Sequence, residues 1–476
     1  MSTYPWPTDP PDARHRAAFA DATPKPFWTD RLPARDPYPP LEGGAEADLC
    51  IVGGGFTGLW AALHAKADDP GRDVVVLEAE RIAHGASGRN GGFAVASLTH
   101  GIENGMARFA DEMRTLERLA HENFAGLVDS VREHAIECDL ELTGDITVAL
   151  EPHEEEWLAE AAELYREFGH EVELLVGEEI RAEIGSPLYR AGLWDRTDVA
   201  MVDPAKLAEG LARAAAGLGV RIHEGTRVES IASAGGGVEV RTTRGPVRAR
   251  GALIATSAYP PLVRSIRRYI APVYDYVLVT EPLDAERREA IGWRRRQGVS
   301  DAANQFHYYR LTDDDRILWG GFDAVYRFRG PVDDRLDDDE EVFAGLAQRF
   351  FTTFPQLEGV RFTHRWGGAI DTCSRFSVFF GTAHRGRVAY AVGYTGLGVA
   401  ASRFGARVGL DLLDGRETEA TRLRYVRRRP VPFPPEPLRS AVIQLTRNRL
   451  AAADRNQGRR GIWLRTLDRL GLGFDS

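Results

Sequence analysis

The chain has 476 residues, of which 43% are hydrophobic, and it carries 60 Lys and Arg against 70 Asp and Glu. That length is enough for two or three domains with sizeable cores. The net charge of −10 argues against general nucleic-acid binding. No run approaches about 18 consecutive apolar residues, and the first residues lack a positive start followed by an apolar core. The sequence therefore predicts neither a transmembrane helix nor a secretory signal, and cytoplasmic location is the default expectation.

The three cysteines, Cys50, Cys138 and Cys373, are too few and too scattered for a disulfide framework or a zinc site. The chain has no H-E-x-x-H and no paired C-x-x-C, so no metal site is predicted. A G-x-S-x-G nucleophile elbow is also absent from the sequence.

Residues 1–46 are rich in Pro and aromatic residues and show no helical period, which indicates an extended strap. The stretch that follows, ADLCIVGGGFTG at 47–58, begins with an apolar run typical of a buried parallel strand. Gly53, Gly55 and Gly58 then fit G-x-G-x-x-G, and a helical pattern starts at once. Such glycines allow a tight turn, close approach of backbone to a pyrophosphate, and close packing of the helix on the strand.

A second apolar run at 74–77 ends at Glu78, which lies 20 residues after Gly58. An acidic side chain at that place accepts the ribose hydroxyls of a dinucleotide. The order of strand, glycines, helix, strand and acid predicts a dinucleotide-binding unit. The alternative is a Gly-rich turn in another α/β fold, with Glu78 as a solvated strand end.

A second Gly-rich stretch, at 85–92, contains Ser87, Arg89 and Asn90. Side chains of this kind and free backbone amides suit phosphate oxygens. The loop follows the second strand of the nucleotide-binding unit, so we expect it to contact the ligand. An ordinary surface loop is the alternative.

The rest of the chain alternates between two kinds of structure. Helical patterns and short strands are predicted for an insertion at 101–195. The chain then returns to the nucleotide-binding half, with a helix, short strands and a buried strand that ends at Thr256. Antiparallel strands of a large sheet are predicted from Ala271. A last strand at 388–392 leads to a third Gly-rich turn and a helix. We expect a binding domain of 47–100, 196–270 and 366–415, a substrate domain of 101–195 and 271–365, and a tail of 416–476.

Four separated blocks agree with one another: GGGFTGL at 53–59, ASGRNGG at 86–92, Ala255-Thr256-Ser257, and GYTGLGVA at 393–400. Their arrangement resembles the FAD-dependent D-amino-acid oxidase (DAO) superfamily. YYRL…RILWGGF, RWGG and the opening PFWTD are similar to the γ-glutamylputrescine oxidase-like amine oxidoreductases. The resemblance covers about residues 25–415. It implies an α/β fold, α+β overall, with a Rossmann-like FAD-binding domain and a discontinuous substrate domain built on a large antiparallel sheet.

The resemblance also implies FAD as the cofactor, with the glycines at the pyrophosphate, Glu78 at the ribose and the backbone of Val228 at the adenine. The residues it assigns to the cofactor are Gly53, Gly55, Phe56, Thr57, Gly58, Glu78, Ser87, Arg89, Asn90, Gly91, Val228, Thr256, Gly396, Leu397 and Gly398. Where many relatives have A-T-G or A-N-G, this chain has Ser257. His84 lies close to where some relatives attach the flavin covalently, but non-covalent FAD is the expectation.

The implied reaction oxidises the C–N bond of a primary or secondary amine or an amino acid to an imine, which gives an aldehyde or keto product. Electrons would pass to oxygen or another carrier. The candidate residues of the substrate pocket are Tyr309, Arg310, His307 and Trp366, with Tyr274, Tyr276 and Tyr308 as further aromatic candidates. Because side chains alternate along a strand, only one of Tyr308 and Tyr309 can face the pocket. Arg310 is the candidate for binding a substrate carboxylate. The alternative is that these residues belong to the core.

Two other functions stay open at this point: a flavoprotein dehydrogenase of 2-hydroxy acids or polyols that feeds a quinone, and a non-catalytic flavin-binding assembly factor. The C-terminal tail is relevant to the quinone-linked dehydrogenase, which would contact a membrane. Residues 416–476 hold 14 Arg against 6 acidic residues, a net charge of +8, and apolar residues recur in them at helical spacing. We expect these helices to pack on the protein itself or on a second subunit. The alternative is peripheral contact with an anionic membrane.

Overall fold

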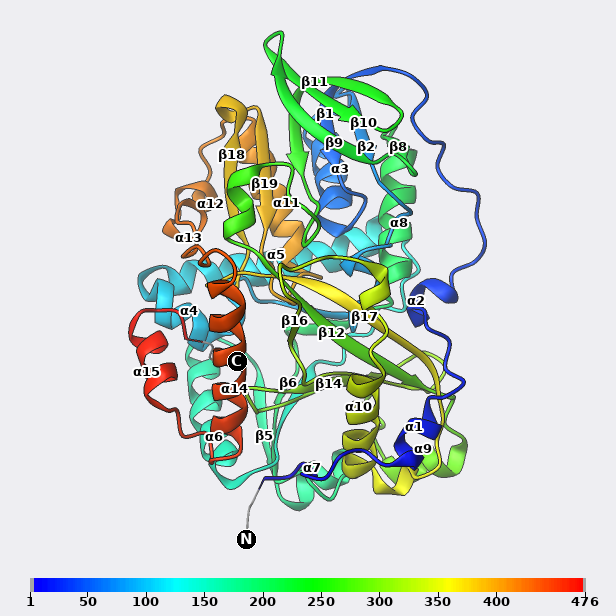
Figure 1. Cartoon of the computed structure of the whole chain (residues 1–476), viewed down its shortest axis with the longest axis vertical. Coiled ribbons are helices and arrows are strands. Elements are labelled where there is room, and N and C mark those ends of the chain that lie inside the picture. The colour runs from blue at the N-terminus through cyan, green and yellow to red at the C-terminus, as the bar shows by residue number, and fades with distance from the viewer. Residues whose placement is uncertain (1–3, 474–476) are drawn as a thin grey trace.

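The computed structural model describes residues 4–473 and has two halves, each organised around one large sheet (Figure 1). The upper half in Figure 1 contains the glycine-rich turn that follows the first strand. The lower half contains the second sheet and the helices that cover it. This mixed α/β arrangement confirms the predicted fold class.

The sheet of the upper half has eight strands, with the order β18-β19-β11-β1-β2-β8, and β10 and β9 continue from β11. β1 pairs in parallel with both β11 and β2. Its last four residues are at most 3% exposed, as expected of an apolar run between two parallel neighbours. The strands are β1 (Ala45–Val52), β2 (Val74–Leu77), β8 (Arg221–His223), β9 (Val228–Ala234), β10 (Gly237–Thr242), β11 (Gly245–Ile254), β18 (Phe379–Ala383) and β19 (Val388–Val392).

Three helices pack together beside this sheet: α3 (Phe56–Asp68), α8 (Pro204–Gly217) and α11 (Ala401–Leu413). α8 begins as predicted, because Asp203 Oδ1 accepts the N–H groups of Ala205 and Lys206 at 2.9 Å. Pro204 occupies the first helical position, where its missing N–H has no partner to lose.

The sheet of the lower half has nine strands, with the order β16-β12-β15-β14-β13-β4-β6-β5, and β17 pairs with the other side of β12. Helix α10 packs on β12, and α6 packs on β5 and β6. The strands are β4 (Asp145–Ala149), β5 (Val172–Val176), β6 (Ala191–Asp195), β12 (Ala271–Thr280), β13 (Gly298–Asp301), β14 (His307–Leu311), β15 (Ile317–Gly321), β16 (Val325–Tyr326) and β17 (Phe362–Thr372). The helices are α6 (Pro152–Glu167), α7 (Glu178–Glu183), α9 (Ala285–Ile291) and α10 (Glu340–Thr353).

The extent of strand β17 contradicts one predicted domain boundary. The sequence suggested that the binding domain resumes at residue 366, but Trp366 pairs with Val277 inside the lower sheet and the strand continues to Thr372. Gly367 makes room for a neighbour rather than a turn, because a Cβ there would lie 2.8 Å from Cε1 of Tyr276. The chain therefore leaves the lower sheet only after β17.

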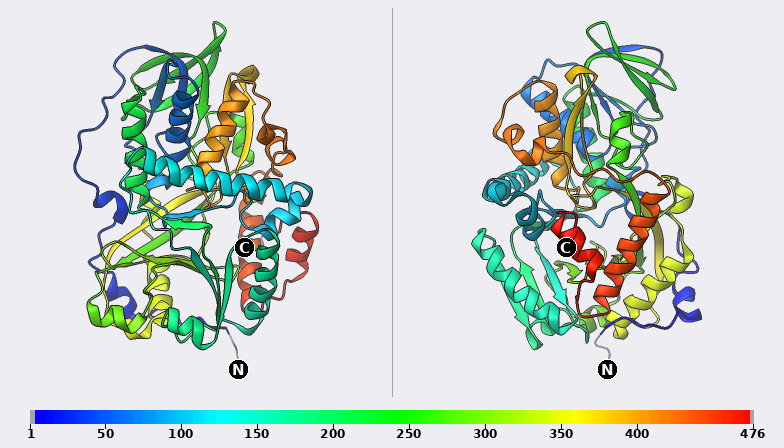
Figure 2. Two further views of the ribbon diagram at one scale, coloured as in Figure 1. Left: turned by 180° about the vertical axis from the view of Figure 1, so that it is seen from behind. Right: turned by 60° about the vertical axis from the view of Figure 1, so that its left-hand side comes forward.

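Helix α5 (Met113–Glu133) lies across the middle of the molecule, between the two halves, as the rear view in Figure 2 shows. Asn123 on this helix donates to the carbonyl oxygen of Ala400 at 2.9 Å. Helix α4 (Ile102–Phe109) precedes it. Two short strands, β3 (Phe93–Val95) and β7 (Val199–Met201), pair with each other in antiparallel fashion and form a separate small sheet.

The N-terminal segment runs along one side of both halves (Figure 1). It is mostly extended, as predicted, but contains two short helices, α1 (Ala13–Ala18) and α2 (Phe27–Asp30). α1 packs on α10 of the lower half. Arg35 then binds both Glu209 and Glu224 beside the upper sheet. The strap therefore ties the two halves together.

The C-terminal tail is helical; its first two helices pack beside α11 and β18 of the upper half, and its last two fold back along the lower half (Figure 2, right). Its helices are α12 (Glu419–Arg422), α13 (Arg424–Arg427), α14 (Leu438–Asp454) and α15 (Ile462–Arg469). Among the described residues, no helix combines the length and apolar character needed to cross a bilayer.

Candidate active site

A cavity of about 1510 Å³ is lined by residues of both halves and of the tail. One end is lined by the turn after β1 and by Glu78, and the loop at 85–91 follows. Strands β12 and β17 and the turn at 395–399 line the part beyond the loop, together with residues of α14 and α15. The predicted blocks, far apart in sequence, therefore meet around one space.

The glycine positions at the first end are required by close backbone contacts. Gly53 has φ +114°, and a Cβ there would lie 2.4 Å from the carbonyl oxygen of Ala255. A Cβ on Gly58 would lie 2.0 Å from the carbonyl oxygen of Gly53. These glycines let the turn approach the end of β11 and let α3 pack against the turn. The N-terminus of α3 borders the cavity, where it favours an anion; Gly55 gives it no side-chain cap, and Ser87 Oγ accepts the N–H of Phe56 at 2.9 Å.

Glu78 lies at the end of β2, on the cavity wall. Its carboxylate accepts the N–H of Gly54 at 2.7 Å and the N–H of Glu80 at 2.9 Å. Burial raises the pKa of this carboxyl group. Each carboxylate oxygen has two lone pairs, so these contacts leave capacity for hydroxyl donors such as those of a ribose.

Nearly all residues that the resemblance assigned to the cofactor line this cavity. They are Gly53, Gly55, Phe56, Thr57, Glu78, Ser87, Arg89, Asn90, Gly91, Val228, Thr256, Gly396, Leu397 and Gly398. Gly58 is the exception, since it lies in the contact between α3 and the turn. Ser257 also lines the cavity and has φ +48°, a left-handed conformation that favours glycine, where many relatives have glycine.

A buried carboxylate, that of Asp371, holds the third Gly-rich turn in place. Asp371 accepts the N–H of Gly393 at 2.6 Å and the N–H of Tyr394 at 3.1 Å. Tyr394 in turn accepts a hydrogen bond from Thr57 of α3 at 2.8 Å. The two Gly-rich turns therefore hold each other in place along the cavity wall. A helix N-terminus between an acid and a backbone-lined turn fits a dinucleotide that carries a pyrophosphate.

Arg89 and His84 connect the ASGRNGG loop to the lower half. The guanidinium of Arg89 is paired with Asp337 and also donates to the carbonyl oxygen of Gly367 at 3.2 Å. His84 lies on the cavity wall with Nε2 3.6 Å from Asp334. Non-covalent binding of FAD, with His84 not attached to the flavin, stays a prediction.

Of the residues predicted to form the substrate pocket, Tyr274 and Tyr308 line the cavity, whereas Tyr309, Arg310, His307, Trp366 and Tyr276 do not. Tyr309 is buried on the opposite face of β14, with its hydroxyl oxygen 2.6 Å from that of Tyr189. His307 is fully buried, with Nδ1 2.6 Å from Asp301. The aromatic residues of this strand that face away from the cavity belong to the core of the lower half.

Arg310 and Trp366 also serve as internal contacts. Arg310 is 2% exposed and donates to the carbonyl oxygen of Val202 at 2.7 Å, while its guanidinium lies over the ring of Trp28. Burial lowers its pKa to about 10. Trp366 donates through Nε1 to the carbonyl oxygen of Arg89 at 2.9 Å. In this structure Arg310 is therefore not placed to bind a substrate carboxylate in the cavity.

Tyr308 and Asp275 form the polar pair that does line the cavity. The Tyr308 hydroxyl donates to Oδ2 of Asp275 at 2.5 Å. The ring lies between two glycines, because a Cβ on either Gly91 or Gly320 would come within 2.7 Å of it. Burial raises the pKa of Asp275 to about 6 and raises that of Tyr308 well above its ordinary value. The alternation of side chains along a strand predicted that either Tyr308 or Tyr309 faces the pocket, without saying which. No sequence feature indicated Asp275.

The tail supplies another wall of the cavity. Ile443 and Leu450 of α14 line it, as do Leu464 and Leu467 of α15. Arg447, also on the wall, pairs with Asp323 at 2.9 Å. The exposed apolar residues of the tail include Leu438, Leu445, Ile462 and Leu470. Packing on the protein thus accounts for one side of the tail, and membrane contact through the exposed side stays a prediction.

Comparison with protein families agrees with this geometry. The model of the family described as FAD dependent oxidoreductase (DAO) matches residues 48–412. The chain belongs to the DAO family of FAD-dependent oxidoreductases. Family membership supports an enzyme that uses FAD. The N-terminal strap and the helices of the tail lie outside the matched residues.

Two curated relatives cover most of the chain. Gamma-glutamylputrescine oxidoreductase of Escherichia coli is 34% identical over 388 residues, which are 80% of this chain and 86% of the relative. A probable oxidoreductase OrdL of Haemophilus influenzae is 30% identical over 390 residues, 79% of this chain and 85% of the relative. The chain is thus similar to amine oxidoreductases of this family.

Two solved structures share the fold. Glycine oxidase from Geobacillus kaustophilus superposes with a TM-score of 0.66 at 21% identity, covering 79% of this chain and 96% of the other. L-proline dehydrogenase from P. horikoshii gives a TM-score of 0.63 at 20% identity, with the same coverage of the two chains. At this identity the likeness shows the fold alone.

Proposed function

We propose that the protein oxidises the C–N bond of a primary or secondary alkyl amine to an imine, which hydrolyses to an aldehyde. The observation that supports this most directly is the Tyr308–Asp275 pair on the cavity wall. FAD, when bound, supplies the two-electron acceptor.

The pair lies close to the third Gly-rich turn. Asp275 is two residues from Val273, which pairs with Ile370 of β17. Cδ1 of Ile370 is 3.9 Å from the position a Cβ would take on Gly396. Since alternate residues of a strand share a face, Asp275 faces the same side as Val273, toward the turn that the resemblance assigns to the flavin.

Asp275 would remove a proton from the substrate. An amine releases hydride only in its neutral form, and an ammonium ion is the form that enters from water. With a pKa of about 6, the Asp275 carboxyl group is ionised at neutral pH, attracts the ammonium and accepts its proton. The Tyr308 hydroxyl holds the carboxylate in place, and the apolar residues of the tail exclude water.

Arg310 of β14 and Arg447 of α14 are held by other groups, which favours an amine over a small α-amino acid. Arg310 is turned into the core, and Arg447 is already paired with Asp323. A second carboxyl group, Asp145, also lines the cavity; burial raises its pKa to about 8, so at neutral pH it is protonated and suits a further hydrogen-bonding group of the substrate. A terminal amine on a longer chain, of the kind named in the γ-glutamylputrescine relative, fits these features.

Anaerobic mixing of the flavin-loaded enzyme with a substrate panel tests the proposal. The panel contains γ-glutamylputrescine, putrescine, glycine, proline and a 2-hydroxy acid. We expect the alkyl amines to bleach the flavin and to yield an aldehyde. Bleaching by the hydroxy acid alone would contradict the proposal and favour the dehydrogenase alternative, whereas bleaching by no member would favour an assembly factor.

The electron acceptor is resolved by repeating the reaction in air. Peroxide formed in step with aldehyde identifies oxygen as the acceptor. Turnover only with an added quinone, together with co-sedimentation with anionic vesicles, would instead favour membrane contact by the tail.

A further inference from the structure

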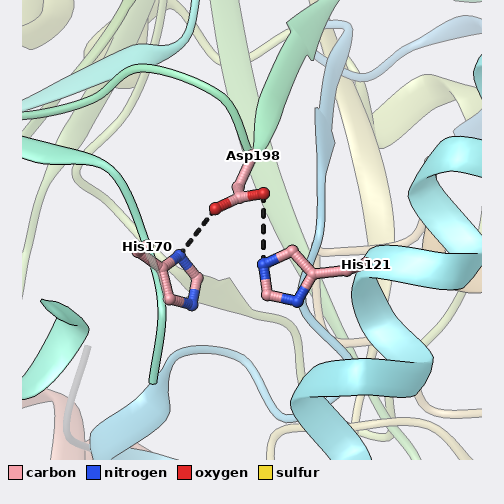
Figure 3. A group of neighbouring side chains, drawn as sticks. All are labelled: His121, His170 and Asp198. Carbon is pink, nitrogen blue, oxygen red and sulfur yellow. Dashed lines mark ion pairs between the residues drawn. The ribbon is translucent and has the colours of Figure 1, made fainter. Parts of the chain in front are cut away.

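A cluster of two histidines and three carboxylates lies outside the residues that line the cavity (Figure 3). His121 is on α5, and Glu117 is one turn before it on the same helix. His170 lies between α6 and β5, and Asp195 and Asp198 lie at the turn from β6 to β7. The cluster therefore joins segments that are far apart in the chain, and no short sequence motif marks it.

Asp198 stands between the two imidazole rings. Its Oδ1 is 3.2 Å from Nε2 of His121, and its Oδ2 is 2.9 Å from Nδ1 of His170. Figure 3 shows the two rings turning one nitrogen each toward this carboxylate. Asp195 adds another oxygen 3.2 Å from the same Nδ1 of His170.

The other nitrogen of each ring is held by an oxygen that can only accept a hydrogen bond from it. Nδ1 of His121 is 2.8 Å from the carbonyl oxygen of Glu117, and Nε2 of His170 is 3.0 Å from the Glu117 carboxylate. Each ring must therefore donate from that nitrogen. Metal-binding histidines are oriented in this way by outer carboxylates and carbonyls, which fix the tautomer and direct the lone pair toward the ion.

In neutral rings held this way, two nitrogen lone pairs face the oxygens of Asp198 at hydrogen-bond distance. Lone pairs and carboxylate oxygens repel each other unless positive charge lies between them. A proton on each ring supplies that charge, and so does one divalent ion. The ligand atoms of His121, His170 and Asp198 all lie within 4.8 Å of one another. Two ligand atoms of a tetrahedral ion with bonds of about 2.0–2.2 Å are roughly 3.4 Å apart, close to the 3.2 Å and 2.9 Å that separate the ring nitrogens from Asp198.

We propose that His121, His170 and Asp198 bind one divalent transition-metal ion, with Asp195 as a further ligand and Glu117 positioning both rings. Mixed imidazole and carboxylate ligands suit Zn²⁺ better than Ca²⁺, which prefers oxygen alone. The site is nearly closed, with side chains of His170 and Asp198 that are 5% and 10% exposed, but His121 is 33% exposed and provides an entry path.

The ion would have a structural role. It would tie α5, the segment before β5 and the β6–β7 turn to one point. The carbonyl oxygen of Asp198 also accepts the N–H of Ala96 at 2.7 Å, directly after β3. Since Val95 of β3 lines the cavity, the site would brace one part of the cavity wall.

Titration of the flavin-loaded enzyme with ZnCl₂ after dialysis against a chelator tests the site. We expect one tightly bound equivalent by calorimetry and a Tm that rises with Zn²⁺ concentration. H121N and D198N should each bind Zn²⁺ at least about tenfold more weakly. H134N is the matched control, because His134 ends the same helix outside the cluster, and it should bind like the wild type.

A second measurement needs no variant. Diethyl pyrocarbonate modifies accessible histidines, and peptide mass spectrometry locates the products. Zn²⁺ should protect His121 but not His134. The proposal is overturned if the wild-type enzyme takes up no Zn²⁺, if H121N and D198N bind it undiminished, if Ca²⁺ binds as tightly, or if Zn²⁺ leaves the modification of His121 unchanged.

Discussion

The two ends of the cavity are built from different parts of the chain. At the end near Glu78, backbone atoms of glycine-rich turns form the wall, and a residue such as Gly53 is required by a carbonyl oxygen only 2.4 Å from its missing Cβ. At the other end, side chains of β12, β14 and the tail form the wall. A site built from backbone atoms therefore leaves a compact sequence signal, whereas a site built from side chains depends on strand register and on segments distant in sequence.

The largest expected effect tests the backbone-built end. G58A places a methyl group 2.0 Å from the carbonyl oxygen of Gly53, which is overpacking that costs about 1–3 kcal/mol or more. We expect loss of most bound flavin, measured as flavin absorbance per protein after gel filtration. G217A is the control, because a Cβ on this glycine of α8 meets nothing within 4 Å. Equal flavin content in the two variants would contradict the steric argument.

The second prediction compares neighbouring tyrosines on opposite faces of β14. Y308F removes a hydrogen bond to a carboxylate, so kcat/KM should fall about 10- to 100-fold. Y309F should leave kcat/KM near the wild-type value and lower the free energy of unfolding by about 1 kcal/mol, because its hydroxyl bonds only within the core. Steady-state kinetics and urea unfolding measure the two effects. The reverse pattern would place Tyr309 in the site.

These tyrosines show which part of the site the sequence could predict. The β1 turn, Glu78 and the turn at 396–398 were identified because each combines special backbone geometry with a fixed place after a strand. Tyr309 was preferred over Tyr308 because the alternation rule does not say which face points inward. In the structure Tyr308 faces the cavity because Gly91 and Gly320 leave room for its ring, and these two glycines come from different parts of the chain.

The third prediction concerns pH. Burial raises the pKa of Asp275 to about 6, so the carboxyl group is neutral below that pH and ionised above it. If ionised Asp275 takes the substrate proton, kcat/KM should rise by about tenfold per pH unit up to about 6 and then level off. D275N should lack this rise. A wild-type profile that is flat between pH 5 and 7 would argue against the role.

The smallest expected effect concerns the tail. I443Q places an amide on the cavity wall and should raise KM about fivefold, corresponding to about 1 kcal/mol. L445Q changes an exposed residue of the same helix, 37% exposed, and should leave KM unchanged. If the exposed side of the tail docks on membranes, L445Q should instead reduce sedimentation with anionic vesicles. Equal effects of both changes on KM would show that α14 does not present one side to the cavity.

The tail also marks the limit of the sequence prediction. Its helical spacing indicated an apolar side, but only packing shows that Leu464 and Leu467 face the cavity while Leu470 faces solvent. The Trp366-Gly367-Gly368 stretch similarly looked like a boundary, because glycine pairs often end a strand. Here they allow close contact inside one.

The order of strands in the upper sheet has a consequence for synthesis of the protein. β1, made first, pairs with β11, and β11 pairs with β19, which ends at Val392. Contacts between such distant segments form slowly, and a growing chain cannot complete this sheet until most of its residues have left the ribosome. A nascent chain that stops before β19 would expose an unpaired strand edge and would lack the turn at 396–398. Retained flavin would therefore report that synthesis had passed the turn at 396–398.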